Sequence, residues 1–190
     1  MLKIAIIGKP NVGKSSLFNR LAKKREAITS DVSGTTRDTK KKILDIDGYL
    51  FELIDTGGID YSTPLFQKVA ELSLVTAKKA DIILFMVDGK TTGDDDERRL
   101  YLELQKQHPG NIALVINKID NDKELERTWD YYNFDSEVMF SISVSHNRGI
   151  AKLKNWLIDF VKEEDEDDII EDDEMSFEDF IDDNTSENGE

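Results

Sequence analysis

One eight-residue stretch, GKPNVGKS at 8–15, constrains the fold of this chain more than any other feature. It fits the pattern G-x-x-x-x-G-K-[ST], in which glycines let backbone N–H groups curl around phosphate oxygens. The apolar run KIAII (3–7) precedes it, and the helix-like segment GKSSLFNRLAKK (13–24) follows it. The N-terminus of a helix also favours a bound anion through its dipole. We therefore expect a phosphate-binding loop between a strand and a helix.

Two side chains of this loop are expected to act on a bound nucleotide. Lys14 can reach the β and γ phosphates as a point charge, and the Ser15 hydroxyl can ligate Mg²⁺. The expected phosphate contacts come from Gly8, Asn11, Val12, Gly13, Lys14, Ser15 and Ser16.

Six apolar runs alternate with helix-like segments over residues 1–162. The runs at 81–88 and 111–117 are nearly unbroken, as is typical of strands that are covered on both faces. Asp47-Gly48 is a two-residue hairpin signal. The alternation predicts an α/β fold with a six-stranded, mostly parallel sheet, one antiparallel strand and helices on both faces. Together with the phosphate-loop motif at 8–15, it indicates the P-loop NTPase class. The expected strands are 3–7, 41–46, 49–55, 81–88, 111–117 and 137–143, and the expected helices are 13–24, 64–80, 98–107 and 149–162.

A second motif, DTGGID at 55–60, follows a predicted strand. Asp55 is expected to hold Mg²⁺ through the ion's water shell, and the Gly58 N–H to meet the γ-phosphate. Hydrolysis at such a site usually calls for a neighbouring polar side chain that orients the attacking water. This chain has Ile59 in that place. Either the protein does not hydrolyse its nucleotide, or it does so with other groups.

The turn NKID (117–120) follows a predicted buried strand and indicates which base is bound. The Asp120 carboxylate can accept from both N1–H and the 2-amino group of guanine, whereas adenine offers neither. A buried site of this kind rejects the wrong ligand by a factor on the order of 10⁴. Lys118 can lay its methylene stem over the base, and Asn117 can tie this turn to the phosphate loop.

Two further loops are expected to complete the site. In SISVSHNRGI (141–150), Ser143 would support the Asp120 turn, and a backbone N–H near Val144 would meet the guanine O6. The stretch SGTTRD (33–38) lies in a long irregular segment, and such segments are usually functional or mobile. A threonine there would complete the Mg²⁺ sphere only when a γ-phosphate is present, which would make the loop a switch.

Taken in their order along the chain, these five motifs resemble those of the translation-factor-related GTPases, and within them those of the bacterial Der (EngA) family. The resemblance covers about residues 1–162 and rests on GKPNVGKSSLFN, TTRD, DTGGID, FMVDG…DDDERRL, NKID and SHNRGI. It implies a G-domain that binds GTP/GDP with Mg²⁺ and acts as a switch in assembly of the large ribosomal subunit. The match is best to the first of two tandem GTPase domains. It implies that the large subunit or its RNA is contacted through a second GTPase domain and a KH-like domain, which this sequence lacks.

The same resemblance bears on Ile59. Der proteins and their relatives carry a hydrophobic residue where Ras-like proteins place glutamine, and several relatives hold K⁺ partly by an asparagine of the phosphate loop. That asparagine is Asn11 here. The resemblance therefore implies slow, K⁺-stimulated hydrolysis, in which cations meet the charge that develops during transfer. The implied catalytic residues are Lys14, Asn11, Thr36 and Gly58, and the implied metal ligands are Ser15, Thr36 and Asp55 for Mg²⁺ and Asn11 for K⁺.

Charge divides the chain into two parts. The net charge is −15, yet residues 163–190 hold sixteen acidic residues and no Lys or Arg. The other 162 residues are almost electrically neutral, with 25 basic and 24 acidic side chains. Self-repulsion and few apolar residues indicate that 163–190 does not fold alone. We expect a GTPase domain at 1–162 and an acidic linker or tail at 163–190.

Composition limits the cellular context and leaves alternative functions open. The chain has no cysteine, and we find neither a signal-peptide pattern nor an apolar stretch of about 20 residues. We expect a cytoplasmic monomer that binds neither membrane nor DNA. One alternative is a nucleotide-dependent interaction module with little hydrolysis of its own, which Ile59 favours. Another is an ATP-using phosphotransferase, which Asp120 opposes.

Overall fold

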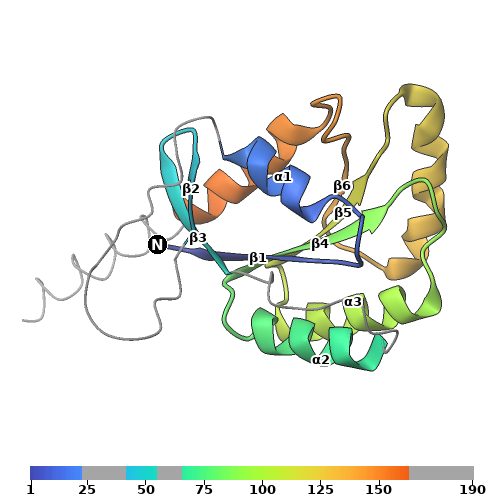
Figure 1. Cartoon of the computed structure of the whole chain (residues 1–190), viewed down its shortest axis with the longest axis horizontal. Helices are drawn as coiled ribbons and strands as arrows, with labels where there is room; N and C mark the ends of the chain where they lie inside the picture. Colours follow the sequence, from blue (N-terminus) through green and yellow to red (C-terminus); the bar gives the residue numbers. More distant parts are fainter. Residues whose placement is uncertain (23–41, 55–65, 163–190) are drawn as a thin grey trace, which may run out of the picture. The chain divides into compact units, whose positions relative to one another are not determined.

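The computed structural model describes residues 1–22, 42–54 and 66–162, and within these ranges six strands form one sheet (Figure 1). Their order across the sheet is β2-β3-β1-β4-β5-β6. All neighbouring pairs are parallel except β2 with β3, which are antiparallel. The predicted α/β fold, with a six-stranded and mostly parallel sheet, is confirmed. The bounds are β1 (Lys3–Ile7), β2 (Lys42–Ile46), β3 (Tyr49–Ile54), β4 (Ile82–Asp88), β5 (Ile112–Asn117) and β6 (Met139–Ser141).

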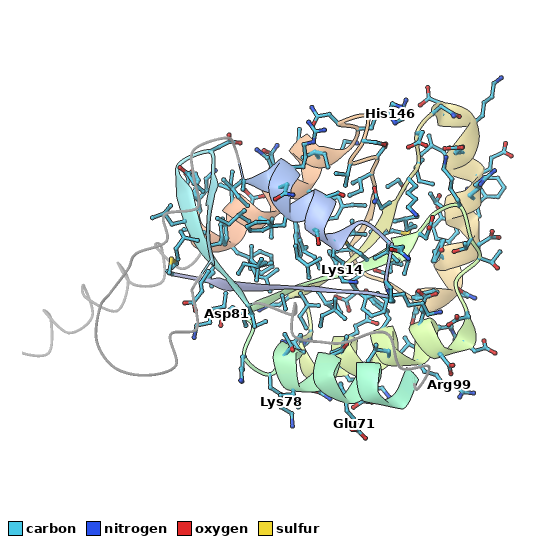
Figure 2. All side chains as sticks on the ribbon, in the orientation of Figure 1. Lys14, Glu71, Lys78, Asp81, Arg99 and His146 are labelled. Carbon is cyan, nitrogen blue, oxygen red and sulfur yellow. The ribbon has the colours of Figure 1, made fainter. Side chains whose placement is uncertain are left out.

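Helices cover both faces of the sheet, as predicted. Helix α1 lies on one face, and α2 and α3 lie on the other (Figure 1). Glu71 of α2 and Arg99 of α3 point outward, as does Lys78, which directly follows α2 (Figure 2). The bounds are α1 (Lys14–Leu21), α2 (Phe66–Ala77), α3 (Asp95–Gln107) and a 3₁₀ helix, η1 (Asp122–Phe134). Residues 150–162 are helical as well.

The chain divides into two compact units, Met1–Lys154 and Asn155–Glu190. The sheet and the candidate site lie in the first unit. In the second, the rings of Trp156 and Phe160 meet edge to face, with their centroids 4.9 Å apart. Residues 163–190 lie outside the described residues, so the domain boundary expected at 162 and the acidic linker stay predictions. Among the described residues, no helix is both long enough and apolar enough to cross a membrane.

The turn between β2 and β3 forms where the sequence predicts it. Asp47 and Gly48 have φ of 53° and 100°, and Ile46 pairs with Tyr49 directly before and after them. A type I′ turn requires positive φ at both central residues, which aspartate followed by glycine tolerates best. The Gly48 N–H also donates to Asp45 Oδ1 at 2.8 Å.

The core of the sheet explains the apolar runs. All six residues of β5 are buried, as are the first six of β4. Alternate strand residues face opposite sides of a sheet, so Phe85 faces α3 while Leu84 and Met86 face α1. On the α3 side, Phe85 meets Tyr101 in a T-shaped contact, with ring centroids 5.4 Å apart. This packing holds β4 and β5 rigidly, and the loops that follow them belong to the candidate site.

Several elements differ from the sequence prediction, and the helices predicted at 13–24 and 64–80 end at Leu21 and Ala77. The helix η1 was not expected, because its segment is largely polar. Its buried residues, Thr128, Tyr131 and Phe134, recur every three positions, which is the period of a 3₁₀ helix. Helix α3 begins before the predicted 98, because Asp94 caps it and forms a capping box with Glu97. The predicted strand 137–143 was too long, because only Met139–Ser141 pair with β5.

Candidate functional site

The loop at residues 8–13 joins β1 to α1, and two of its glycines are fixed by close contacts. A Cβ atom on Gly8 would lie 2.3 Å from the carbonyl oxygen of Met86. A Cβ atom on Gly13, whose φ is 106°, would lie 2.4 Å from Asn117 Nδ2. Any side chain at either position would collide with β4 or with the residue that ends β5. Glycine therefore allows the loop to pass directly over the ends of these strands.

Lys14 occupies the start of α1 and folds back over the loop. Its ammonium donates to the carbonyl oxygens of Gly8 and Lys9, at 2.7 Å and 2.6 Å. Burial lowers the pKa of the Lys14 ammonium to about 8. Figure 2 shows Lys14 between α1 and the strands. Ser15 and Ser16 follow it and are exposed. Among the described residues, no side chain caps the N-terminus of α1 at Gly13, so the first N–H groups of this helix are suited to an anion.

Asn117 connects three loops of the site. Its side chain is 4% exposed. The amide Nδ2 donates to the carbonyl oxygen of Val12 at 2.8 Å, and Oδ1 accepts from the Val144 N–H at 3.1 Å. The contact expected between Asn117 and the phosphate loop is therefore present. The Val144 N–H, expected near a guanine O6, has Asn117 as its partner in this structure.

Asp120 lies at the next turn and is surrounded by hydrogen-bond donors. Its Oδ1 accepts from the Ser143 hydroxyl at 2.7 Å, and its Oδ2 accepts from the Lys90 ammonium at 2.7 Å. The bond from Lys90, followed by that from Ser143, holds the pKa of the Asp120 carboxyl well below its usual range. The backbone N–H of Asp120 donates to Glu124 Oε2 at 2.8 Å. Asp120 is thus an ionised acceptor whose position is fixed from several sides.

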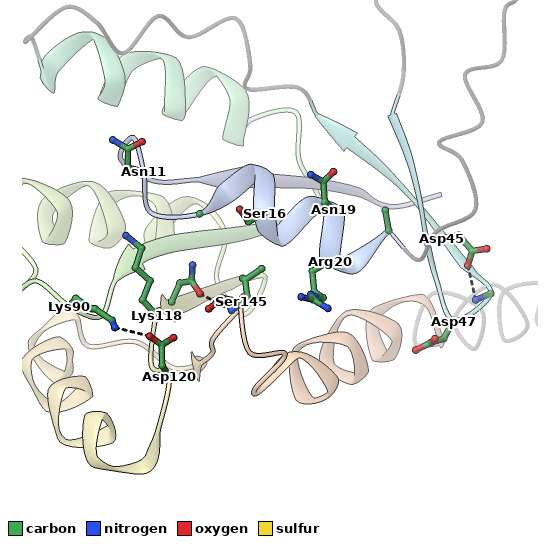
Figure 3. Close-up of a pocket in the computed structure, with 15 residues that line it drawn as sticks. Asn11, Ser16, Asn19, Arg20, Asp45, Asp47, Lys90, Lys118, Asp120 and Ser145 are labelled. Atoms are coloured by element: carbon green, nitrogen blue, oxygen red, sulfur yellow. Dashed lines mark hydrogen bonds and ion pairs between the residues drawn. The ribbon is translucent and has the colours of Figure 1, made fainter.

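Lys118 stands beside Asp120 (Figure 3). Its backbone φ is 71°, and its ammonium forms an ion pair with Asp88 at 2.5 Å. Asp88 ends β4, and its second carboxylate oxygen accepts from the Lys90 N–H at 2.9 Å. One carboxylate thus orients Lys118 and the turn that presents Lys90.

These loops line one cavity of about 1540 Å³ (Figure 3). That volume exceeds the 300–1,000 Å³ typical of ligand pockets, and the cavity continues to Asp45, Asp47 and Gly48 of the β2–β3 turn. Of the predicted site residues, the cavity wall includes Asn11, Gly13, Ser16, Asn117, Lys118, Asp120 and Val144. Three further predicted residues are buried, namely Gly8, Val12 and Ser143. The hydrogen bond between Val12 and Asn117 and that between Ser143 and Asp120 hold the residues of the wall in place. Thr36, Asp55, Gly58 and Ile59 lie outside the described residues.

Sequence reasoning missed three side chains that organise the site, namely Asp88, Lys90 and Glu124. The signal for Asp88 was available, because it ends a predicted parallel strand, as Asn117 does, and such ends gather at one edge of the sheet. Lys90 and Glu124 gave no signal of their own. Their contacts depend on the turn after β4 and on η1, and the sequence did not predict η1.

The far side of the phosphate loop is anchored to α3. The Lys9 ammonium forms an ion pair with Asp94, the N-cap of α3, and lies 3.6 Å from Glu97 Oε2. These three residues line a second cavity of about 310 Å³. The phosphate loop is therefore held from both sides, by Asn117 at one end and by α3 at the other.

A family model described as 50S ribosome-binding GTPase matches residues 3–118, which include the phosphate loop and Asn117. The chain belongs to the 50S ribosome-binding GTPase family. Membership makes it a GTP-binding protein of the GTPase class.

Within this family, the chain is similar to GTPase Der proteins, so the resemblance to the Der family is confirmed. It is 56% identical to GTPase Der of Sulfurimonas denitrificans over 165 residues, which are 87% of this chain and 33% of that protein. It is 50% identical to GTPase Der of Campylobacter curvus in an alignment of 191 residues that covers 100% of this chain and 40% of that protein. The chain thus spans between a third and two fifths of the length of these relatives.

Solved structures of GTPases share the fold. A variant of Aquifex aeolicus Era bound to GDP·AlF4⁻ is similar with a TM-score of 0.59 and 26% identity, covering 84% of this chain and 57% of that one. The G domain of the T. maritima FeoB iron transporter is similar with a TM-score of 0.58 and 25% identity, covering 85% of this chain and 99% of that one.

Proposed function

We propose that this member of the 50S ribosome-binding GTPase family binds GTP with Mg²⁺, hydrolyses it to GDP and phosphate, and acts as a switch in assembly of the large ribosomal subunit. The observation that supports this most strongly is the pair of hydrogen bonds made by Asn117, to Val12 at 2.8 Å and from Val144 at 3.1 Å. Through them, the loop that bears Lys14 and the turn that bears Asp120 flank one cavity.

On the phosphate side, the ammonium of Lys14 supplies positive charge. In this structure it donates to the carbonyl oxygens of Gly8 and Lys9. Phosphate oxygens carry full negative charge and form stronger, charge-assisted bonds with an ammonium. We infer that Lys14 holds the β and γ phosphates, with the N–H groups of the first turn of α1 around them.

Mg²⁺ fits the residues present at the start of α1. The Ser15 side chain is exposed there, and its hydroxyl is the hard oxygen donor that this ion prefers. Ser15 would hold the ion together with Thr36 and Asp55, for which the sequence alone argues. When bound, Mg²⁺ would neutralise charge on the phosphate oxygens.

On the base side, the ionised carboxylate of Asp120 can only accept hydrogen bonds. Guanine offers two donors, at N1 and at the 2-amino group, while adenine offers an acceptor at N1. Ser143 holds Oδ1 at 2.7 Å, which fixes the direction of the carboxylate. The Lys118 stem stands beside it with its ammonium anchored on Asp88. This arrangement favours guanine and opposes the ATP-using alternative.

A glutamine in the place of Ile59 would orient the attacking water, so hydrolysis by this chain depends on other groups, including cations that meet the charge developing during transfer. Asn11 has a φ of 66° and lines the cavity, and its amide oxygen is a suitable ligand for K⁺. We propose slow hydrolysis that K⁺ stimulates through Asn11 and that Lys14, Thr36 and Gly58 support. Ile59 still favours a second candidate function, an interaction module that binds GTP and scarcely hydrolyses it.

The large-subunit role is supported by the description of the family, 50S ribosome-binding GTPase. A solved structure of Era with nucleotides of 16S ribosomal RNA, which belongs to the small subunit, supports contact with ribosomal RNA in general. Because this chain spans 33–40% of its Der relatives, we propose that contacts with the large subunit or its RNA use further domains of such proteins. Residues 163–190 would be the linker to them. A cytoplasmic monomer that binds neither DNA nor membrane stays our expectation.

Two measurements test the proposal. Calorimetry with Mg²⁺ should show GDP and GTP binding far more tightly than ADP and ATP, and equal affinities would contradict the base assignment. Phosphate release from GTP should be faster in KCl than in NaCl for the wild type, and Asn11→Ala should remove the difference. Tight GTP binding without turnover in KCl would favour the interaction module.

A further inference from the structure

Lys90 makes a contact that a guanine base would have to share. Its ammonium donates to Asp120 Oδ2 at 2.7 Å, across thirty positions of the sequence. The turn that presents it is fixed, because Asp88 accepts the Lys90 N–H at 2.9 Å and the Gly89 N–H donates to the Asn117 carbonyl at 2.7 Å. A Cβ atom on Gly89 would lie 2.8 Å from that same carbonyl oxygen. The fixed backbone of this turn therefore places Lys90 beside Asp120.

The contact lies on the side from which a ligand would approach. Lys90 and Asp120 line the same cavity (Figure 3), and the Lys90 side chain is 44% exposed. Oδ1 of Asp120 already has the Ser143 hydroxyl at 2.7 Å and His146 Nδ1 at 3.2 Å. Guanine presents two adjacent donors and needs both carboxylate oxygens. The ammonium takes one of the two lone-pair directions of Oδ2, and it competes with a guanine donor because both approach from the cavity that Lys90 lines.

The carboxylate of Glu124 lies close enough to pair with Lys90 once the lysine leaves Asp120. Glu124 Oε1 lies 3.6 Å from the Lys90 ammonium, and Glu124 Oε2 is held by the Asp120 N–H at 2.8 Å. A small movement would bring Lys90 from Asp120 to Glu124. The lysine would keep an ionic partner in either position, so leaving Asp120 costs it little.

We propose that Lys90 is a displaceable competitor for the base-binding carboxylate. Its ammonium occupies Asp120 Oδ2 until a guanine donor replaces it, and it then pairs with Glu124. The inference rests on the proposed guanine specificity and names a residue that tunes it. Because the competitor is tethered to the same chain, it acts at a high effective concentration. Lys90 thereby weakens nucleotide binding and speeds nucleotide release.

The first test compares GDP affinity, by calorimetry with Mg²⁺, among the wild type, Lys90→Met and Lys123→Met. Methionine keeps an unbranched apolar stem without the charge, and Lys123 is an exposed lysine of η1 that serves as the matched control. Lys90→Met should bind GDP about two- to fivefold more tightly, because the exposed ion pair that GDP no longer has to break contributes only a small free energy. Its release of a fluorescent GDP should slow by a similar factor. Lys123→Met should match the wild type.

Equal or weaker GDP binding by Lys90→Met, with an unchanged melting temperature, would overturn the inference. Lys90→Gln provides a second variant if the first is unstable, and it should also bind more tightly. If the wild type itself binds no guanine nucleotide, the proposed function fails. Wild-type binding that Lys90→Met and Lys90→Gln leave unchanged rejects only the competitor.

Glu124→Gln tests the second position of the lysine. Glutamine keeps an acceptor for the Asp120 N–H but lacks the charge that attracts Lys90. In the wild-type background it should weaken GDP binding about twofold, because Lys90 then stays on Asp120. In the Lys90→Met background it should change nothing. An equal effect in both backgrounds would contradict the transfer to Glu124.

Discussion

The buried amide of Asn117 donates to the carbonyl oxygen of Val12 at 2.8 Å, and this hydrogen bond joins two turns that are 105 residues apart in the sequence. The same side chain accepts from the Val144 N–H. A polar group this deeply buried costs free energy unless it is paired, so its bonds fix the distance between the phosphate loop and the base-binding turn. The candidate site is preformed by one residue that need not touch the reacting atoms.

We predict that Asn117→Ala leaves the Val12 carbonyl and the Val144 N–H without their partner. The loss of two hydrogen bonds to buried groups should lower the free energy of unfolding by about 2 kcal/mol. Nucleotide affinity should fall more than tenfold, because the two halves of the site are no longer held together. Urea unfolding and calorimetry with GDP measure both effects. Asn133→Ala, at an exposed position of η1, is the control, and equal effects of the two substitutions would contradict the account.

Gly13→Ala and Gly110→Ala form a matched pair. Both glycines have positive φ, at 106° and 78°, so alanine is strained at each. Only at Gly13 would the new Cβ atom collide with another group, Asn117 Nδ2 at 2.4 Å, whereas Gly110 faces open space. Gly110→Ala should cost about 1 kcal/mol, and Gly13→Ala should cost at least twice that and also weaken GDP binding. If thermal unfolding showed an equal loss of stability in the two variants, the contact with Asn117 would be unimportant.

The lowered pKa of Lys14, about 8, predicts a pH dependence of phosphate binding. The free protein loses the Lys14 proton as the pH rises through 8, while a bound phosphate favours the charged form. GDP affinity should therefore fall about three- to fourfold between pH 7.0 and 8.5. A Lys14→Ala variant should bind weakly and show a flat profile over this range. A flat profile for the wild type would contradict the role of Lys14.

The same shift has a consequence for the stability of the ligand-free protein. The folded pKa lies below the unfolded value, 10.5, so the unfolded chain binds more protons between about pH 8 and pH 10.5. The contribution of Lys14 to stability should therefore increase with pH in this window. Urea unfolding of the wild type and Lys14→Met at pH 7.5 and pH 9.5 measures it, and the difference between the two proteins should move in favour of the wild type at the higher pH.

Tyr131→Phe tests the support of the turn that follows β4. The Tyr131 hydroxyl is buried and shares its one proton between the carbonyl oxygens of Asp88 and Thr91, which lie 2.7 Å and 2.9 Å from it. Removing it should lower stability by about 1 kcal/mol. Tyr132→Phe, whose ring is 63% exposed, should be close to neutral. Similar melting temperatures of the two variants would show that the hydroxyl does not hold the turn.

The sheet could be predicted from the sequence because β4 and β5 are buried on both faces. Strands of this kind are nearly unbroken apolar runs, which are visible in the sequence. The sequence also placed Asn117 and Asp120 near the phosphate loop, because the carboxyl ends of parallel strands meet at one edge. It did not predict η1, whose burial depends on three side chains in an otherwise polar segment. Nor could it predict Lys90 at Asp120, since that contact requires the exact path of a turn. Local patterns set the elements, while contacts between loops depend on the assembled fold.

The role of Asp120 in base recognition can be tested by replacing it with asparagine and measuring affinities for guanosine and xanthosine diphosphates in Mg²⁺. The carboxylate accepts the guanine donors, whereas an amide can donate to the 2-oxo group of xanthine. We predict that the wild type prefers the guanosine nucleotide and that Asp120→Asn prefers the xanthosine nucleotide. A folded Asp120→Asn protein that kept its preference for guanosine would show that Asp120 does not read the base in the cavity that it shares with the phosphate loop.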